Sequence, residues 1–351
     1  MASPCRSPSE SPLPGRYELS HERSSEASQV FDILARSADR FGWRFEADGA
    51  WLVESIPCRT GTIHRVRTAT GGDVAVKACV QHWSPDDARS AFEVLDTVDR
   101  LLHHDPGVSV PKPYGWDEQV PAICMSWADG VSLRSVLESG QHCLPDDRTL
   151  TTEAALGCGR AYGLLHAGTL ESVTSRGSGR QHGSDGVTPG DGTSTGRSRH
   201  RRDKRQRIRV LRGPGSTPQN VLVSPDGHVT LVDSPRLRRL VSPHRALAKF
   251  LVHAFADLAR SDASGDRMGP TFARFERAFL EGYAEAGPTV LHRRHDVRLL
   301  NLHRARVSAD LAVPAFRTGR RAEALRLAVH AARLLVGSIR PSPLRTRASK
   351  G

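Results

Sequence analysis

The sequence predicts an α+β fold of two lobes, in which a small lobe rich in strands precedes a larger lobe made mostly of helices. Two observations support this prediction. The first part of the chain reads as a helix, strands, a second helix and further strands, whereas the part beyond residue 128 is dominated by the 3.6-residue period of helices. The chain has 351 residues, of which 38% are hydrophobic, and this is enough to bury a core in two lobes.

Shifts in composition set the expected boundaries. We place the strand-rich lobe at residues 27–127 and the helical lobe at residues 128–339. Residues 1–26 are rich in proline and serine and lack the apolar stretch of a signal peptide, so they are expected to be a disordered tail. Residues 340–351 are expected to be a second tail. Residues 172–212 hold almost no large apolar side chain and are expected to be a disordered, basic insert in the helical lobe.

The elements of the small lobe follow from local patterns. Residues 27–46 carry apolar side chains at roughly helical spacing and predict a short amphipathic helix. Residues 51–57 and 61–80 read as strands, with a Thr-Gly-Gly-Asp turn inside the second stretch. Residues 84–104 open with Ser-Pro-Asp-Asp, which is typical of a helix start. Residues 121–127 form a short apolar run and predict a buried strand.

The elements of the large lobe are mostly helices by period. A stripe of Phe272, Phe275, Phe279 and Tyr283 marks the buried face of one of them. The helical stretches are expected at residues 132–140, 151–171, 245–260, 271–287 and 296–339.

A hairpin is predicted in "NVLVSPDGHVTLVD", between Asn220 and Asp233. Pro225 suits the second position of a type I turn, and Gly227 suits the fourth. Because antiparallel pairing brings the outer ends of a hairpin together, Asn220 and Asp233 should lie side by side. An amide oxygen and a carboxylate are suitable ligands for Mg²⁺ that is held together with phosphates. By itself, the hairpin also fits an ordinary turn that is closed by capping polar residues.

Lys77 lies in the strand "GDVAVKACV" among apolar neighbours. Its ammonium group either extends outward to solvent or reaches the phosphates of a nucleotide. In the second case, Glu93 in the next helix would hold the lysine as an ion pair. Gly61 and Thr62 would form a turn above the phosphates, since glycine allows close backbone approach. The chain has no GxxxxGK sequence followed by Ser or Thr, which excludes the P-loop class of nucleotide site.

In their order and spacing, these stretches resemble the aminoglycoside phosphotransferase and choline-kinase-like family, which has a protein-kinase-like fold. The resemblance covers roughly residues 50–171 and 217–290. The stretches that carry it are "GTIHRV", "VAVK", "VSVPKPYGW", "ICMSWADGVSL", "AYGLLHAGTLE", "TPQNVLVSPDGHVTLVD" and "FLEGYAEAG".

The resemblance implies ATP and Mg²⁺ as cofactors and phosphoryl transfer to a hydroxyl group of a small molecule. The implied nucleotide contacts are Gly61, Thr62, Lys77, Glu93 and the backbone of Ser126 to Ala128. The implied Mg²⁺ ligands are Asn220 and Asp233, and His166 stands in the family's usual Leu-His pair.

The sequence departs from the family at one catalytic position. The family reads His-Gly-Asp shortly before the Pro-x-Asn of the hairpin, and that Asp orients or deprotonates the acceptor hydroxyl. Counting back from Asn220, its place falls on Gly215, which has no proton acceptor in its side chain. The hydroxyl groups of Ser216 and Thr217 are not basic at neutral pH. No catalytic residue is therefore identified, and we expect turnover to be low or absent.

Residues 172–216 have a composition that suggests an origin. They are rich in Gly, Arg, Ser and Thr, as GC-rich coding DNA gives when it is read in another frame. "RGP" at residues 212–214 is also what a His-Gly-Asp codon run gives when it is read two bases on. We hypothesise a reading-frame slip that is restored at Thr217; the alternative is a genuine basic insert. Coding DNA across residues 165–220 with no shifted frame for His-Gly-Asp would reject the slip.

The positive charge is unevenly spread. The formal charge is +12 and the isoelectric point about 10.1, yet residues 172–215 hold about +8 and residues 291–351 about +11, which leaves about −7 for the rest. The basic insert has no interleaved aromatic residues to stack on bases, which argues against a nucleic-acid partner. The chain lacks an apolar run long enough to span a membrane.

Six scattered cysteines without a CxxC pair argue against zinc and disulfides and favour a reduced, cytoplasmic setting. Three functions stay open at this point: a phosphotransferase, a nucleotide-binding pseudokinase that acts as a scaffold, and a basic nucleic-acid binder. The acceptor and the oligomeric state also stay open.

Overall fold

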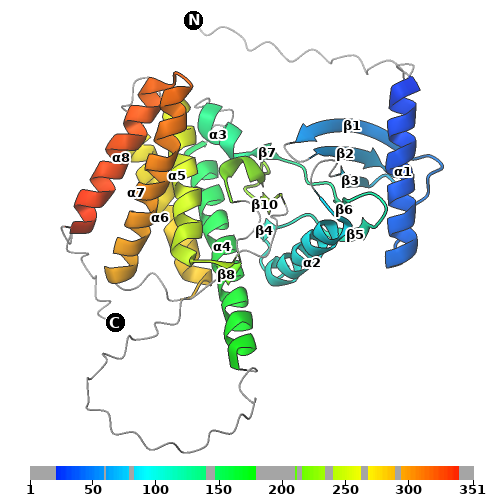
Figure 1. Cartoon of the computed structure of the whole chain (residues 1–351), viewed down its shortest axis with the longest axis horizontal. Helices are drawn as coiled ribbons and strands as arrows, with labels where there is room; N and C mark the ends of the chain where they lie inside the picture. The colour runs from blue at the N-terminus through cyan, green and yellow to red at the C-terminus, as the bar shows by residue number, and fades with distance from the viewer. Residues whose placement is uncertain are drawn as a thin grey trace, which may run out of the picture.

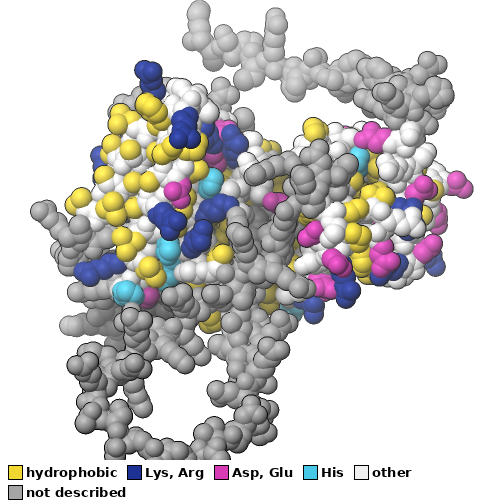
Figure 2. All heavy atoms as spheres, viewed as in Figure 1, with side chains coloured by type: hydrophobic (Ala, Val, Ile, Leu, Met, Phe, Trp, Pro, Cys, Tyr) yellow, Lys and Arg dark blue, Asp and Glu magenta, His cyan; other side chains and the backbone are white. Residues whose placement is uncertain are grey.

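Two lobes lie side by side in the computed structural model, which is drawn as a ribbon in Figure 1 and as spheres in Figure 2. The small lobe carries one sheet with a helix on each face, and the large lobe is built mainly of helices. The predicted α+β class, with the strand-rich lobe first, is confirmed. The structure describes residues 21–58, 61–78, 83–139, 147–178, 210–211, 216–233, 240–261, 268–288 and 294–339.

The sheet of the small lobe is antiparallel and five-stranded, with the order β1-β2-β3-β6-β5. The two hairpins β1–β2 and β2–β3 form from neighbouring sequence, whereas β3 pairs with β6 across the intervening helix. The strands are β1 (Trp51–Cys58), β2 (Gly61–Arg67), β3 (Asp73–Ala78), β5 (Pro113–Asp117) and β6 (Ala122–Ser126).

Different helices cover the two faces of this sheet. Val74 and Val76 of β3 pack in a cluster with residues of α1 (His21–Phe41). Ala75 faces the other way, toward α2 (Pro85–Leu102) and the core of the large lobe. Because side chains alternate along a strand, Lys77 shares the face of Ala75 and points toward the large lobe.

The large lobe has six helices among the described residues, together with two small sheets. Its hairpin, β9 (Val221–Val223) and β10 (Val229–Leu231), is flanked by β7 (Val131–Ser132) and, in parallel, by β4 (Val108–Ser109). A single turn of 3-10 helix, η1 (Pro218–Asn220), leads into the hairpin. The helices are α3 (Leu133–Ser139), α4 (Asp147–Ser178), α5 (Pro243–Ser261), α6 (Met268–Ala286), α7 (Arg294–Arg317) and α8 (Arg321–Ile339), and a second sheet pairs β8 (Val210–Leu211) with β11 (Leu240–Val241).

Helices α4 and α6 approach until their backbones touch. A Cβ atom added at Gly282 would lie 2.1 Å from the carbonyl oxygen of Leu156, and one added at Gly159 would lie 2.0 Å from that of Phe279. Glycine is therefore required at both positions for the helices to pack this closely. The aromatic stripe predicted on α6 is buried against this contact, as the sequence period indicated.

Several boundaries differ from the expected ones. Helix α1 begins at His21, inside the region expected to be a tail, because "HERSSE" contains helix formers that carry no apolar period. Helix α4 runs to Ser178, past the expected start of the insert at residue 172. The stretch expected at 296–339 is two helices, separated at Gly319, whose φ is 79°. Residues 1–20, 179–209, 212–215 and 340–351, which include most of the expected tails and insert, lie outside the described residues.

Candidate active site

Lys77 reaches across the boundary between the lobes. Its side chain is buried, with the residue 5% exposed, and its Nζ donates to Oδ1 of Asp233 at 2.8 Å. The ammonium group also lies 5.9 Å from the centre of the Trp83 ring. A buried lysine is stable only with a compensating partner, and Asp233 supplies that partner from a position 156 residues away.

Asp233 joins this lysine to the hairpin of the large lobe. Its second oxygen, Oδ2, accepts from Nδ2 of Asn220 at 2.9 Å. The backbone N–H of Val232 donates to the carbonyl oxygen of Asn220 at 2.9 Å, so the hairpin ladder itself holds the two residues together. The predicted proximity of Asn220 and Asp233 is therefore present, and Lys77 joins them in one cluster.

Asp233 has an unusual backbone. Its φ is 80°, and it is the one non-glycine residue with positive φ among those described. Aspartate tolerates this left-handed conformation better than most residues, at some cost in free energy. The conformation directs the half-exposed carboxylate toward Lys77 and Asn220.

The donor set of this cluster suits a hard cation. Among the described residues, no group of three or more His, Cys, Asp or Glu side chains is arranged to hold a metal ion. Asp233 and Asn220 alone would leave most positions around Mg²⁺ to phosphate oxygens and water, which is the usual way proteins hold this ion. The residues present thus fit Mg²⁺ bound together with a nucleotide, and the metal role stays a prediction.

The predicted ion pair between Lys77 and Glu93 is wrong. Glu93 pairs with Arg89, one turn earlier on α2, at 3.0 Å. The buried face of α2 consists of Ala88, Ala91, Leu95, Val98 and Leu102. At about 100° per residue, Glu93 lies on the opposite side of the helix from that face and is half-exposed.

Ser126, Trp127 and Ala128 connect the small lobe to β7 of the large lobe. The N–H of Ser126 donates to the carbonyl oxygen of Lys112 at 2.9 Å, and that of Trp127 donates to Asp73 at 3.1 Å. Within the described part of the chain, the backbone of Ala128 makes no hydrogen bond. The segment expected to meet adenine therefore has one backbone N–H group without a partner among the described residues, that of Ala128.

Gly61 and Thr62 begin β2 next to the end of β3. Gly61 pairs with Cys58, and Thr62 pairs with Ala78, the residue after Lys77. The predicted turn above the phosphates therefore lies at the edge of the sheet where Lys77 ends its strand. Arg59 and Thr60, the tip of this turn, lie outside the described residues.

The expected position of the catalytic Asp, Gly215, lies outside the described residues. The chain is described again from Ser216, whose Oγ accepts from Nζ of Lys249 at 3.3 Å. Thr217 follows, and its Oγ1 is buried without a hydrogen-bond partner among the described residues.

His166 is a core residue rather than a reactive one. It is fully buried, and its Nδ1 lies 3.0 Å from the hydroxyl oxygen of Tyr283. Burial, followed by the nearby His244, lowers the pKa of His166 to about 3. The imidazole is therefore neutral at physiological pH.

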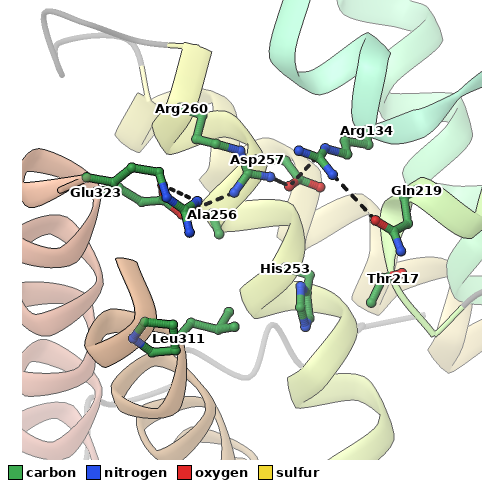
Figure 3. A pocket seen from close by; sticks show the side chains of 11 residues that line it. Arg134, Thr217, Gln219, His253, Ala256, Asp257, Arg260, Leu311 and Glu323 are labelled. Atoms are coloured by element: carbon green, nitrogen blue, oxygen red, sulfur yellow. Dashed lines mark hydrogen bonds and ion pairs between the residues drawn. The ribbon is translucent and has the colours of Figure 1, made fainter. Parts of the chain in front are cut away.

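A pocket that the sequence reasoning missed adjoins the cluster. It has a volume of about 240 Å³ and lies between η1 and helices α3, α5, α7 and α8 (Figure 3). Thr217 and Gln219 form part of its wall, and Gln219 directly precedes Asn220. Its other lining residues are Arg134, His253, Ala256, Asp257, Arg260, Leu311, Pro314, Arg320 and Glu323.

No family model matches the chain, and no curated protein matches it in sequence. Solved structures do resemble it, and those named here are 11 to 17% identical. An amicoumacin kinase, hAmiN, in complex with AMP-PNP, Ca²⁺ and Ami is 12% identical, with a TM-score of 0.48, over 90% of this chain and 96% of that one. The macrolide 2'-phosphotransferase MphH of Brachybacterium faecium is 17% identical, with a TM-score of 0.44, over 92% of this chain and 100% of that one.

An ethanolamine kinase of Plasmodium vivax is 11% identical, with a TM-score of 0.44, over 84% of this chain and 83% of that one. Likenesses at this distance assign neither an activity nor a substrate. None of the helices among the described residues is long and apolar enough to span a membrane.

Proposed function

We propose that this protein is an ATP- and Mg²⁺-binding phosphotransferase whose acceptor is a hydroxyl group of a small molecule. One observation carries the proposal. Lys77 of the small lobe and Asn220 of the large lobe each bond to a different oxygen of Asp233, whose backbone is held in a left-handed conformation. Strained backbone and a buried lysine that is paired across two lobes are typical of a functional site.

Each side chain of the cluster has a role in this proposal. Bound ATP and Mg²⁺ would supply the transferable phosphoryl group and neutralise its charge. Lys77 would bind the nucleotide phosphates through its ammonium group. Asp233 and Asn220 would hold the metal ion through their side-chain oxygens. The neighbouring pocket holds the acceptor, because Gln219 and Thr217 in its wall lie within three residues of Asn220.

Turnover is expected to be low. Transfer proceeds mainly by positioning and charge stabilisation, so a site without a base keeps part of its rate. The Asp that would orient the acceptor hydroxyl is replaced by Gly215 in this sequence. A pseudokinase that binds nucleotide as a scaffold is the second candidate, and it shares every residue of the cluster.

Thermal melting of the full chain with and without ATP and Mg²⁺, followed by a radiolabelled transfer assay on a panel of hydroxyl compounds, separates these candidates. A nucleotide-dependent rise in Tm with labelled product supports the phosphotransferase. A rise in Tm without any product supports the scaffold. No rise in Tm rejects both. Salt-dependent retention on nucleic acid that is lost when residues 172–212 are deleted would instead support the third candidate.

A further inference from the structure

The pocket beside η1 is built around arginines. Arg134, Arg260 and Arg320 come from α3, from α5 and from the turn before α8. Two acids, Asp257 and Glu323, also line the pocket. The charged groups of its wall therefore carry a net excess of one positive charge at neutral pH.

Arg260 ties the network together. Its Nη2 bonds to Asp257, its Nη1 donates to Glu323 at 3.1 Å, and its Nε donates to Glu138 at 2.7 Å. Figure 3 shows Arg260 between Asp257 and Glu323. All three nitrogens of this guanidinium group are engaged, so Arg260 holds the two acids of the pocket in place.

Each of the other two arginines has one donor nitrogen that makes no hydrogen bond among the described residues. Arg134 donates from Nε to Glu138 at 2.8 Å and from Nη1 to Gln219 at 3.4 Å. Its Nη2 makes no hydrogen bond within the described residues. Burial raises the pKa of Glu138, but the hydrogen bonds from Arg134 and Arg260 outweigh this effect and hold it below its usual value, so the carboxylate stays ionised.

Arg320 has a similar arrangement of hydrogen bonds. It donates from Nε to Thr318 at 3.1 Å and from Nη1 to Glu323 at 2.9 Å. Its Nη2 is likewise unused within the part of the chain that the structure describes. Each guanidinium can thus give further charge-assisted hydrogen bonds to a ligand without releasing its present partner.

Exposure decides which charge a ligand meets. The side chains of Asp257 and Glu323 are only 5% and 9% exposed, whereas those of Arg134 and Arg320 are 41% and 47% exposed. The two acids are more deeply buried than the two arginines, and both are already paired with Arg260. A ligand in the pocket therefore meets guanidinium groups first, and a cationic ligand would meet like charge without a free carboxylate.

The volume of the pocket and the hydroxyl group of Thr217 limit the class of ligand further. About 240 Å³ lies below the range of about 300 to 1,000 Å³ of drug-sized sites, which suits a single small ring or a shorter chain. The Oγ1 of Thr217 is buried in the wall without a partner among the described residues. A ligand hydroxyl at this point would satisfy it.

We propose that the pocket binds a small hydroxyl compound that carries an anionic group, with Arg134 and Arg320 as the residues that recognise the anion. This inference rests on the proposed function, because it names the class of the acceptor. It excludes polycationic and quaternary ammonium acceptors. A carboxylate and a phosphate ester are both within the proposed class, because arginine binds either anion through the same paired donors.

Four hexose derivatives of matched shape test the charge preference. Binding of glucuronate, glucose 6-phosphate, glucose and glucosamine to the full chain is measured by calorimetry, with and without ATP and Mg²⁺. We expect the two anionic sugars to bind at least about tenfold more tightly than glucose, and glucosamine to bind more weakly than glucose. The two anionic arms distinguish a carboxylate from a phosphate ester.

Two variants test the residues. Arg134→Gln and Arg320→Gln are each expected to weaken binding of the anionic sugars by about tenfold and to leave glucose unchanged. Arg100→Gln is the matched control, because it removes the same charge from an exposed ion pair with Asp96 on α2. Circular dichroism verifies that each variant is folded. Because the side chain of Arg320 is half-exposed, the Arg320→Gln variant should fold. It therefore tests the proposal even if Arg134→Gln does not fold.

The outcomes separate the two proposals. Glucosamine binding as tightly as glucuronate, anion binding unchanged in both arginine variants, or no anion binding at all would overturn the acceptor class. If the ATP-dependent rise in Tm is still present in that case, the proposed function stands. Anion binding without any ATP-dependent rise in Tm supports the pocket and rejects the phosphotransferase.

Discussion

Asp233 differs from the other residues of the site in two structural features. It accepts hydrogen bonds from two lobes and has the left-handed backbone that a Cβ atom disfavours. A capping residue of an ordinary hairpin would need neither feature. The combination favours the metal interpretation over the simple turn, and it makes the conformation of Asp233 testable apart from its charge.

We predict that Asp233→Gly is more stable than Asp233→Ala by about 1 kcal/mol, because glycine adopts the φ of 80° without steric cost. Both variants lose the same carboxylate, so their difference reports the backbone alone. Urea unfolding measures it.

Asp129 provides the control for this pair. It is strongly exposed, and it is absent from the residues with positive φ. At this position the alanine variant should be at least as stable as the glycine variant. Equal stability of the two Asp233 variants would contradict the proposed strain.

At the scale of elements, the contact between α4 and α6 depends on glycine. Gly282→Ala would place a methyl group 2.1 Å from the backbone oxygen of Leu156. We predict a loss of about 1 to 3 kcal/mol in the free energy of unfolding, because neither helix can move without disturbing its core. Gly269→Ala on the same helix is the control: it has open space around it and should change stability by less than about 1 kcal/mol. A similar effect of the two substitutions would argue against the close packing.

Helices α5, α6 and α8 meet around His330. Its ring stacks on Phe255 with centroids 4.0 Å apart and lies edge-on to Phe272. Burial, followed by Arg304 and Arg333, lowers the pKa of His330 to about 3. The unfolded chain, with an imidazole pKa of about 6.5, therefore binds a proton that the folded chain rejects.

The sign of the pH dependence follows from this difference. The contribution of His330 is fully present above pH 6.5 and is lost as the pH falls toward 3. At pH 5 the loss is about 2 kcal/mol. In His330→Phe, which keeps the ring stack, the difference in unfolding free energy between pH 7.5 and pH 5 should shrink by about this amount. Urea unfolding at the two pH values measures it, and an unchanged difference would contradict the prediction.

The sequence predicted most helices and strands correctly, but it did not predict correctly on which side of α2 the side chain of Glu93 lies. Helix α2 starts at its Ser84 cap with a capping box, as the Ser-Pro-Asp-Asp opening indicated. The error at Glu93 came from carrying over an ion pair from the resembling family. The five apolar positions of α2 already place Glu93 on the solvent side, so the helical period contained the correct answer. The helical period could not predict the ends of α1 at His21 and of α4 at Ser178, because no periodic apolar residues mark them.

At the scale of the whole molecule, the ion pair between Lys77 and Asp233 and the segment from Ser126 to Ala128 join the two lobes near the site, and α2 and β4 join them farther away. The proximity of Asn220 and Asp233 was predictable, because a hairpin is local. The pocket was not predictable, because its wall combines residues from α3, η1, α5, α7 and α8 that only the tertiary fold brings together.

We predict that Lys77→Met abolishes the rise in Tm caused by ATP and Mg²⁺ while leaving the fold intact. Methionine fills a similar buried volume, and Asp233 is exposed enough to be solvated after it loses the lysine. Thermal melting with and without nucleotide measures this. Arg89→Met, on the exposed side of α2, is the control and should keep the full rise. An undiminished rise in the Lys77 variant would show that this residue does not take part in the proposed nucleotide site.

Helix α2 has a place in the fold that its sequence order does not suggest. Leu95, Val98 and Leu102 belong to the same buried cluster as the helices of the large lobe, and the chain after α2 pairs through β4 with β10. Its Ala88 and Ala91 pack on the other side against Trp116 and Ile123 of the small-lobe sheet. Helix α2 is therefore shared by the cores of both lobes. A substitution on the buried face of α2, such as Ala91→Leu, would therefore disturb the packing of the sheet, and through α2 the position of the sheet relative to the large lobe.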